Sequence, residues 1–326
     1  MSDARLLKMY ATCESGLEEA LASELTELGG LEIETGLRGV AFGGTHEVMW
    51  RANVCSRVAN RILVQLAQFR VRGQDDLYEG TSRVDWTRVL SADQTLAVDT
   101  TGGTASADRG RIIARELANQ VVKDAICDQL RRKTGSRPSV DRQDADVPLN
   151  LMLRGERATL SLDASGARLH RRGYRTEAGP APLKETVAAG ILRLAGWTGE
   201  TSLLDPVCGA GTIAIEAALL ARAIPPGLER LEPGGLGFAF QRWVTHEAEA
   251  FEVLMGPIRD AILPSASAAI VASDIEPGVL GKARRNAERA GVAEDIDFRQ
   301  GDAALAEPVA ETGILIGNPP YGERIG

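Results

Sequence analysis

The chain has 326 residues and a formal net charge of −8, and its 44% hydrophobic and 25% charged residues are those of an ordinary globular protein with length for two or three domains. No apolar run approaches the length of a membrane span, and the first thirteen residues lack the layout of a secretion signal, so we expect a cytoplasmic protein with no membrane partner. The four cysteines (Cys13, Cys55, Cys127 and Cys208) have no Cys-x-x-Cys spacing, which argues against a zinc site and a disulfide framework, and we expect no metal.

The charge is unevenly distributed along the chain. Residues 105–175 contain 15 Lys or Arg and 9 Asp or Glu, a net charge of +6, which leaves −14 for the remainder. This asymmetry would allow one domain to hold phosphate while another does not. A local charge excess is more often a solvated face, so it supports nucleic-acid binding without establishing it.

The first seventy residues have a regular alternation of elements. Hydrophobic periodicity predicts strands over residues 6–13, 31–34, 39–42 and 62–69, a helix over 16–28 that ends at Gly29-Gly30, and a second helix that starts near Thr45, whose hydroxyl could cap it. A β-α-β-β-α-β order is typical of a ferredoxin-like module. Such modules host many functions, so the order alone indicates none.

The next stretch, residues 71–163, has a different order. Helices are predicted around Asp76–Tyr78 and Trp86, then a strand over 95–101 and a long amphipathic helix over 109–133. A hairpin follows, with strands over 149–153 and 158–162 turned at Gly155-Glu156. The long helix ends in Arg131-Arg132-Lys133, which suits the helix dipole as well as it suits a phosphate contact.

A cationic segment then precedes a linker around Gly179-Pro180. Residues 169–175 read Leu-His-Arg-Arg-Gly-Tyr-Arg, and four cations around Tyr174 could hold RNA phosphate while the ring stacks on a base. The same cations could equally pair with acids at a domain junction. His170 alone gives no reason to expect a general base.

A glycine-rich turn opens the last part of the chain. A helix over 186–194 leads to an apolar strand over 201–204, which runs into Asp205-Pro206-Val207-Cys208-Gly209-Ala210-Gly211-Thr212 and a helix over 212–223. Gly209 and Gly211 let backbone N–H groups approach a ligand. Gly-x-Gly alone also fits nicotinamide enzymes. Two features favour S-adenosylmethionine instead: the strand ends in an acid followed directly by proline, and Ala214 stands where a dinucleotide fingerprint has its third glycine.

Two further acids follow strands. A strand over 269–273 ends in Asp274, whose carboxylate can accept both hydroxyls of a ribose, and the strand over 297–300 precedes Asp302, which could accept an adenine amino group or simply cap a helix. The insertion over 222–268 separates the first acid from the glycine turn, and Trp243 within it is expected in a core.

The strand over 313–317 leads to Asn318-Pro319-Pro320-Tyr321. The two prolines remove two backbone donors and stiffen the chain, which creates a rigid corner. The Asn318 side-chain oxygen and the Pro319 carbonyl can accept both hydrogens of an exocyclic amine, and Tyr321 can stack on the ring that bears it.

These motifs together resemble a known family. Asn-Pro-Pro-Tyr is similar to motif IV of class I S-adenosylmethionine-dependent methyltransferases that act on exocyclic or amide nitrogen. Residues 11–13, 16–18, 122–126, 137–141, 169–175 and 181–185 resemble the bacterial THUMP-domain methyltransferases that make N2-methylguanosine in 23S ribosomal RNA. The resemblance implies an α/β protein with a ferredoxin-like module (1–68), a THUMP RNA-binding domain (69–166), a linker (167–183) and a Rossmann-like methyltransferase domain (184–326).

The resemblance also implies roles for residues. Asn318, Pro319, Pro320 and Tyr321 would be catalytic; the cofactor-binding set would be Asp205, Pro206, Cys208, Gly209, Gly211, Thr212, Asp274, Ile275, Asp302, Ala303 and Asn318. The cofactor would be S-adenosylmethionine, and the partner 23S ribosomal RNA or a pre-ribosomal particle. The insertion would pack beside the site. A class I sheet has seven strands and only four can be placed here, so we expect the catalytic domain to be incomplete.

Other functions stay open at this point. The Asn-Pro-Pro-Tyr corner does not separate ribosomal RNA from transfer RNA, or guanine N2 from an adenine or glutamine amide. A non-catalytic RNA-binding protein with a degenerate Rossmann-like domain, and a nicotinamide oxidoreductase, are alternatives of other classes. Binding of S-adenosylmethionine would discriminate against both.

Overall fold

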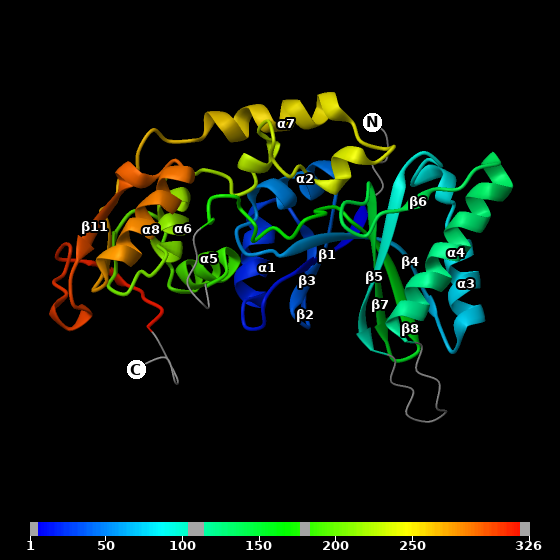
Figure 1. Ribbon diagram of the computed structural model, residues 1–326, viewed down its shortest axis with the longest axis horizontal. Helices are drawn as coiled ribbons and strands as arrows, with labels where there is room; N and C mark the ends of the chain where they lie inside the picture. The colour runs from blue at the N-terminus through cyan, green and yellow to red at the C-terminus, as the bar shows by residue number, and fades with distance from the viewer. Residues whose placement is uncertain (1–5, 104–113, 177–182, 320–326) are drawn as a thin grey trace.

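The computed structural model describes residues 6–103, 114–176 and 183–319, which form three consecutive units (Figure 1). The first unit has the predicted β-α-β-β-α-β order. Its elements are β1 (Leu7–Thr12), α1 (Glu18–Glu27), β2 (Leu31–Gly36), β3 (Gly39–Gly44), α2 (His46–Cys55) and β4 (Arg61–Arg70). Thr45 occupies the position before α2, but its side chain makes no capping hydrogen bond, so that prediction was wrong. Its carbonyl instead accepts from the Met49 N–H at 3.1 Å.

The second unit extends the same sheet. It contains α3 (Gln74–Ser82), η1 (Trp86–Arg88), β5 (Thr95–Gly103), α4 (Arg115–Thr134), β6 (Ser139–Val140), β7 (Val147–Arg154) and β8 (Arg157–Asp163). The strands of both units make one eight-stranded sheet in the order β2-β3-β1-β4-β8-β7-β5-β6. The predicted boundary at residues 68 and 69 falls inside β4, and it stays a prediction.

Helix α4 is shorter than the sequence indicates. It begins at Arg115, not at residue 109, and Ala114 has extended backbone angles; residues 104–113 lie outside the described residues. It ends at Thr134, and the next residue, Gly135, has a φ of +81°, a left-handed conformation that glycine adopts without strain. Arg131 and Lys133 at this end pair with Asp128 and Asp85, so at least these two members of the basic triplet are occupied.

The third unit is a parallel α/β sandwich. Its strands β9 (Ser202–Asp205), β10 (Ile270–Asp274), β11 (Ile296–Gln300) and β12 (Gly313–Leu315) form a sheet in the order β11-β10-β9-β12. The helical elements of this unit are α5 (Glu185–Leu194), α6 (Thr212–Ala221), η2 (Glu229–Leu231), η3 (Ala239–Arg242), α7 (Ala248–Asp260), α8 (Pro277–Arg289), η4 (Ala293–Asp295) and η5 (Ala303–Leu305). Buried β9 residues and α6 form the centre of this unit's own core.

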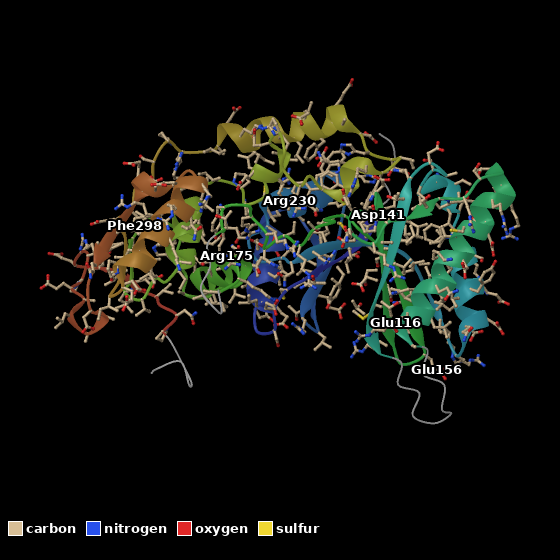
Figure 2. All side chains as sticks on the ribbon, in the orientation of Figure 1. Glu116, Asp141, Glu156, Arg175, Arg230 and Phe298 are labelled. Atoms are coloured by element: carbon tan, nitrogen blue, oxygen red, sulfur yellow. The ribbon has the colours of Figure 1, made fainter. Side chains whose placement is uncertain are left out.

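The insertion over 222–268 packs mainly on the N-terminal units. Phe251 of α7 contacts Trp50 of α2 with ring centroids 5.7 Å apart, and Phe240 contacts both rings. Arg230, which is labelled in Figure 2, lies within this part of the chain. Its guanidinium stacks 4.5 Å from the centre of the Phe238 ring and donates to the carbonyls of Ser165 and Ala167. The expectation that the insertion packs beside the site is not tested by these contacts and stays a prediction. Trp243 is buried, as predicted.

A buried polar network joins the third unit to the first. Arg172 donates to the Arg57 carbonyl at 2.6 Å, and its Nε lies 3.6 Å from Glu216 Oε1 in α6. Arg57 in turn donates to the Ile224 carbonyl at 2.8 Å. Tyr174 is buried and donates to Glu216 at 2.9 Å. Of the two roles that the sequence left open for this segment, Tyr174 and Arg172 therefore have the pairing with an acid at a domain junction and not the stacking on a base. Because α6 begins at the glycine turn, this network fixes that turn relative to the N-terminal units.

The described helices include none that is long and apolar enough to cross a bilayer.

Candidate active site

The site lies where the strands of the parallel sheet end. Residue Ile270 of β10 pairs with Leu203 of β9 and with Ile296 of β11, and Gly313 of β12 pairs with Ser202. Because all four strands point the same way, the residues that follow them meet at one edge, which is where open α/β sheets bind ligands. The segments at this edge are the glycine turn after β9, the end of β10, the residues after β11 and the Asn318-Pro319 corner after β12.

The glycine turn is held against β10 by backbone hydrogen bonds. The Cys208 N–H donates to the Ser273 carbonyl at 2.9 Å, and the Gly209 N–H donates to Asp274 Oδ2 at 3.0 Å. Gly209 has a φ of +55° and open space within 4 Å of where a Cβ would stand. Gly211 has a φ of +81° and approaches α8 so closely that a Cβ would lie 3.0 Å from that of Ala283. The turn therefore presents bare backbone to an open space on one side and packs tightly on the other.

Two groups in this turn have strongly raised pKa values. Asp205 is buried, and this burial raises its pKa to about 7. The hydrogen bond from the Val207 N–H acts against the rise, and the Asp274 charge adds a smaller contribution to it. Burial, followed by the charges of Asp205 and Asp274, raises the pKa of the Cys208 thiol far above its ordinary range. Cys208 therefore stays protonated and is not a nucleophile. Its backbone N–H makes the hydrogen bond that holds the turn against β10.

The ends of β10 and β11 supply acceptors and apolar surface. Asp274 accepts from Gly209 with one oxygen and from the Glu276 N–H with the other, at 3.1 Å. Ile275 beside it is 60% exposed, which is unusual for isoleucine. The Asp302 side chain accepts from the Ala304 N–H at 2.9 Å and so caps the short helix η5, which is one of the two roles that the sequence allowed. Ala303 follows it on the exposed surface.

The residues after β12 pass directly beside the glycine turn. The Ile316 N–H donates to the Leu204 carbonyl at 2.9 Å, which continues the strand pairing. A Cβ on Gly317 would lie 2.8 Å from Val207 Cγ2 and 3.5 Å from Asp205 Oδ1. Asn318 and Pro319 follow on the exposed edge, whereas Pro320 and Tyr321 lie outside the described residues. The structure thus brings together the Asp205 turn, Asp274 and the start of the Asn-Pro-Pro-Tyr corner, but it does not test their roles.

Sequence reasoning did not single out Gly317. It was part of an apolar strand, and a glycine there gives no signal until the neighbouring strand is known. The contact with Val207 supplies the reason for the small residue, because a side chain would collide with the turn.

Comparisons with known proteins agree with this arrangement. Residues 8–63 match the RlmL ferredoxin-like domain, residues 72–163 the THUMP domain, and residues 172–326 the RMKL-like methyltransferase domain. A protein of Synechocystis sp. named as a putative RNA methyltransferase is 37% identical over 317 residues, which cover 97% of this chain and 80% of that protein. The chain belongs to the THUMP-domain, RMKL-like methyltransferase family. The predicted family and fold class are therefore confirmed.

Other relatives in this family are longer proteins than this chain. The ribosomal RNA large subunit methyltransferase K/L of Psychromonas ingrahamii is 39% identical over 326 residues, and the match covers 98% of this chain but 42% of that protein. The chain thus spans about two fifths of the length of such K/L relatives.

Solved structures share the fold of the family over almost the whole chain. A predicted N6-adenine-specific DNA methylase from Listeria monocytogenes has a TM-score of 0.85 at 30% identity, covering 98% of this chain and 81% of its own. The putative methyltransferase SMU.472, solved in complex with SAH, has a TM-score of 0.84 at 26% identity and covers 98% of this chain and 82% of its own. SAH is what S-adenosylmethionine becomes on giving up its methyl group, so the predicted cofactor is confirmed for this family.

The residues at the sheet edge fit that cofactor. The space beside Gly209 leaves room for a ligand against backbone, Asp274 and Asp302 are acceptors for hydroxyl and amino groups, and Ile275 offers an exposed apolar side chain. The described residues contain no group of three or more His, Cys, Asp or Glu placed to hold a metal ion.

Proposed function

We propose that this chain, as part of the catalytic unit it shares with its relatives, transfers a methyl group from S-adenosylmethionine to the exocyclic N2 of a guanine in 23S ribosomal RNA. Three things support the proposal: the family of the chain, the names of K/L relatives as methyltransferases of large-subunit ribosomal RNA, and the Asn-Pro-Pro-Tyr corner. The observation that carries it is the closeness of Gly317 to Asp205 and Val207, because it puts this corner beside the turn that would hold the cofactor.

We assign the cofactor-binding roles to residues on three strand ends. The backbone of Gly209 and Gly211, with the flanking Pro206, Cys208 and Thr212, would approach the amino-acid portion of the ligand. Each oxygen of Asp274 accepts one backbone N–H and keeps a second lone pair, so the pair can receive the two ribose hydroxyls. Ile275 would cover one face of the adenine ring, and Asp302 with Ala303 would contact its amino edge.

The acceptors at the corner would orient the nucleophile. The bound cofactor supplies an electrophilic methyl group on a sulfonium. A guanine N2 amine is a weak nucleophile, because its lone pair is delocalised into the ring. If Asn318 Oδ1 and the Pro319 carbonyl each accept one N–H, the lone pair is directed at the methyl carbon, and Pro320 keeps the corner rigid. Alignment of this kind can lower a barrier by roughly 7–11 kcal/mol.

The remaining steps need no metal and no covalent enzyme intermediate. The N–CH3 bond forms as the S–CH3 bond breaks, and the methylated nitrogen then releases one proton to water. A base inside a helix does not reach the corner, so the target guanine would be flipped out and stacked on Tyr321. Asp205 is not assigned as the base, because it is buried beneath the turn and not on the exposed edge.

The test is methyl transfer by the wild-type chain and by Asn318→Ala. We expect labelled methyl to enter 23S ribosomal RNA with the wild type, and Asn318→Ala to lower the rate constant by about 100-fold or more while changing cofactor affinity less than threefold. Asn286→Ala, an amide on α8 that donates to the Ala210 carbonyl at 3.1 Å, is a control for loss of an amide near the turn. Equal losses of rate and of cofactor affinity in Asn318→Ala would overturn its assignment.

Bulk transfer RNA is the second substrate in the same assay. Label in transfer RNA alone would keep the methyltransferase chemistry and discard the ribosomal substrate. No label in either RNA together with no binding of S-adenosylmethionine would favour an RNA-binding protein that has lost catalysis. If the cofactor still binds and neither RNA is labelled, protein-free 23S ribosomal RNA is not the substrate, and the pre-ribosomal particle is the next substrate to assay.

A further inference from the structure

Helix α8 packs closely against the glycine turn. A Cβ on Gly211 would lie 3.0 Å from the Cβ of Ala283, and the buried residues of α8 are Ala283, Asn286 and Ala287. Alanine at two of these positions suits the close approach. The third buried residue, Asn286, is 0% exposed and places an amide on the same face of the helix.

An amide is unfavourable at this position unless it is hydrogen-bonded. Asparagine is less suited than alanine to the interior of a helix, because its side chain competes for backbone hydrogen bonds. Burial of an amide without partners adds a further cost. The two neighbouring alanines show that a small apolar side chain fits against the turn. The hydrogen bonds of Asn286 are therefore the reason to look for a role beyond packing.

Asn286 contacts the middle of the glycine turn. Its Nδ2 donates to the Ala210 carbonyl at 3.1 Å. Arg289, three residues later on α8, donates from Nη1 to Asn286 Oδ1 at 3.1 Å. A guanidinium has donors only, so this contact directs the oxygen of the amide towards Arg289 and its N–H groups towards Ala210.

The hydrogen bond from Asn286 fixes one peptide group of the turn. The Gly211 N–H belongs to the same peptide group as the Ala210 carbonyl, and it donates to the Cys208 carbonyl at 2.8 Å. This peptide group is thus held at both its donor and its acceptor. By contrast, the Ala210 N–H makes no hydrogen bond with another residue that the structure describes, and it is available to a ligand.

Without the Asn286 amide, the peptide group between Ala210 and Gly211 would be held on one side only. Gly211 has a φ of +81° and no Cβ, so its side of the peptide offers little resistance to rotation. A rotated peptide would turn the N–H groups at the start of α6 away from an anionic ligand group. A ligand would then have to restore the turn, and its affinity would fall by the cost of that ordering.

We propose that Asn286 is a positioning residue for the cofactor. Its amide holds the Ala210 carbonyl, which presents the N–H groups of the turn to the amino-acid portion of S-adenosylmethionine. Asn286 acts through the turn. The proposal rests on the proposed function in one respect, the glycine turn as the cofactor site, and it does not depend on the RNA substrate or on the target atom.

The test is binding of S-adenosylhomocysteine and of adenosine to the whole chain, measured by isothermal titration calorimetry beside thermal unfolding. Adenosine has the nucleoside of the cofactor without its amino-acid portion. The test variant is Asn286→Ala, and the matched control is Asn53→Ala. Asn53 of α2 is 1% exposed, donates to the Met49 carbonyl at 2.9 Å and accepts from Ser165 Oγ at 2.7 Å. The control therefore removes an equally buried, hydrogen-bonded amide from the first unit.

Asn286→Ala should weaken binding of S-adenosylhomocysteine by about 10-fold or more, because a carbonyl of the turn loses its donor. Adenosine should lose less than about threefold, since it has no group to place against the turn. Asn53→Ala should change neither affinity by more than about threefold, although both variants lower the melting temperature. This pattern is the reverse of the one expected for Asn318→Ala, which lowers the rate and keeps cofactor affinity.

Three results would overturn the positioning role. They are an unchanged affinity of Asn286→Ala for S-adenosylhomocysteine, an equal loss for S-adenosylhomocysteine and adenosine, and an equal loss in Asn286→Ala and Asn53→Ala. A second variant, Asn286→Asp, keeps the volume of the side chain but replaces the donor by a carboxylate, which only accepts when it is ionised. At pH 8 we expect it to lose at least as much affinity as the alanine variant. Wild-type affinity in Asn286→Asp would show that the amide N–H is not needed.

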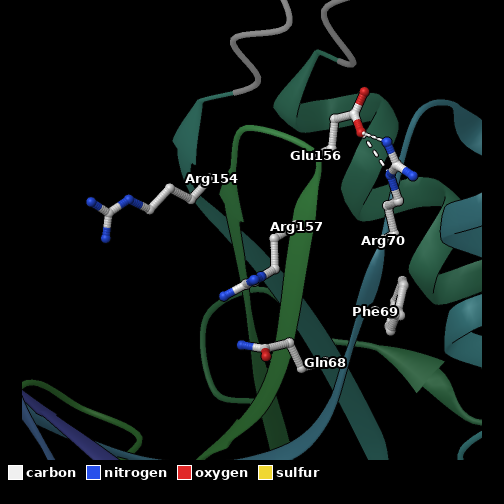
Figure 3. A pocket seen from close by; sticks show the side chains of 6 residues that line it. All are labelled: Gln68, Phe69, Arg70, Arg154, Glu156 and Arg157. Carbon is white, nitrogen blue, oxygen red and sulfur yellow. Dashed lines mark hydrogen bonds and ion pairs between the residues drawn. The ribbon is translucent and has the colours of Figure 1, made fainter.

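Two further variants separate failure of this proposal from failure of the cofactor site. A cavity of about 620 Å³ in the second unit is lined by Gln68, Phe69, Arg70, Arg154, Glu156 and Arg157 (Figure 3). Gln68→Ala removes from it an amide that donates to Thr159 Oγ1 at 3.1 Å. Loss of affinity in Gln68→Ala but not in Asn286→Ala would place the ligand in that cavity and overturn both proposals. Loss in Asp274→Ala but not in Asn286→Ala would keep the cofactor site and overturn the positioning role alone.

Discussion

The approach of Gly317 to the glycine turn gives the sharpest test of the site. In Gly317→Ala the new Cβ would stand 2.8 Å from Val207 Cγ2, whereas carbon atoms in contact are about 3.5–4.0 Å apart. Relief requires Val207 or the strand end to move by about 0.7 Å or more. Val207 is two residues before Gly209, whose hydrogen bond to Asp274 is already 3.0 Å long. The movement would therefore disturb the turn that we assign to the cofactor.

Overpacking of this kind costs about 1–3 kcal/mol. A strain energy of this size, if it arises in the cofactor complex, weakens binding of S-adenosylmethionine by about 5- to 150-fold. The accompanying change in thermal stability is smaller. Isothermal titration calorimetry gives the dissociation constant directly. Gly301→Ala is the matched control, because a Cβ at Gly301 meets nothing within 4 Å. Cofactor affinity of Gly317→Ala equal to that of the wild type and of Gly301→Ala would refute the reasoning.

Three further predictions concern stability. The pKa of Asp205 is raised to about 7, so the folded state holds a proton that the unfolded state releases near pH 4. The free energy of unfolding therefore falls as pH rises from about 4 to 7. In urea unfolding, Asp205→Asn should be more stable than the wild type by a few kcal/mol at pH 8, and the difference should vanish at pH 4. Arg172→Met leaves Glu216 buried without its cation and should cost about 3–5 kcal/mol in urea unfolding, a loss below about 1 kcal/mol being inconsistent with the network. Phe251→Ala should cost about 3–5 kcal/mol, because its ring is 2% exposed and contacts Trp50 and Phe240; an unchanged melting temperature would contradict that packing.

Much of the fold could be predicted from local patterns. The apolar strand before Asp205, the glycines after it and the helix from Thr212 follow one another within twenty residues, so periodicity and turn chemistry identified them. The hairpin turned at Gly155 was equally clear. By contrast, the start of α4 at Arg115 was missed, because apolar residues before it continued the helical spacing while the backbone at Ala114 is extended.

What the sequence left open depended on partners far apart in the chain. Tyr174 lies among four cations in the sequence, which suggested base stacking, but its hydroxyl finds Glu216 42 residues away. The same segment divides into Arg172, which is buried, and Arg171, which is exposed, and no local pattern distinguishes them. The phenylalanines of the insertion belong to the core around Trp50, and nothing in the local sequence indicated that packing partner. In each case, contacts with another unit of the fold decide whether the side chain is buried or exposed.

The central claim is the transfer of a methyl group to guanine N2 in ribosomal RNA. The direct measurement is nucleoside mass spectrometry of protein-free 23S ribosomal RNA after incubation with this chain and S-adenosylmethionine, beside the same reaction with Asn318→Ala. We predict N2-methylguanosine in the wild-type reaction and its near absence in the variant. Methylation of adenine in place of guanine, or equal amounts of N2-methylguanosine with wild type and variant, would contradict the account.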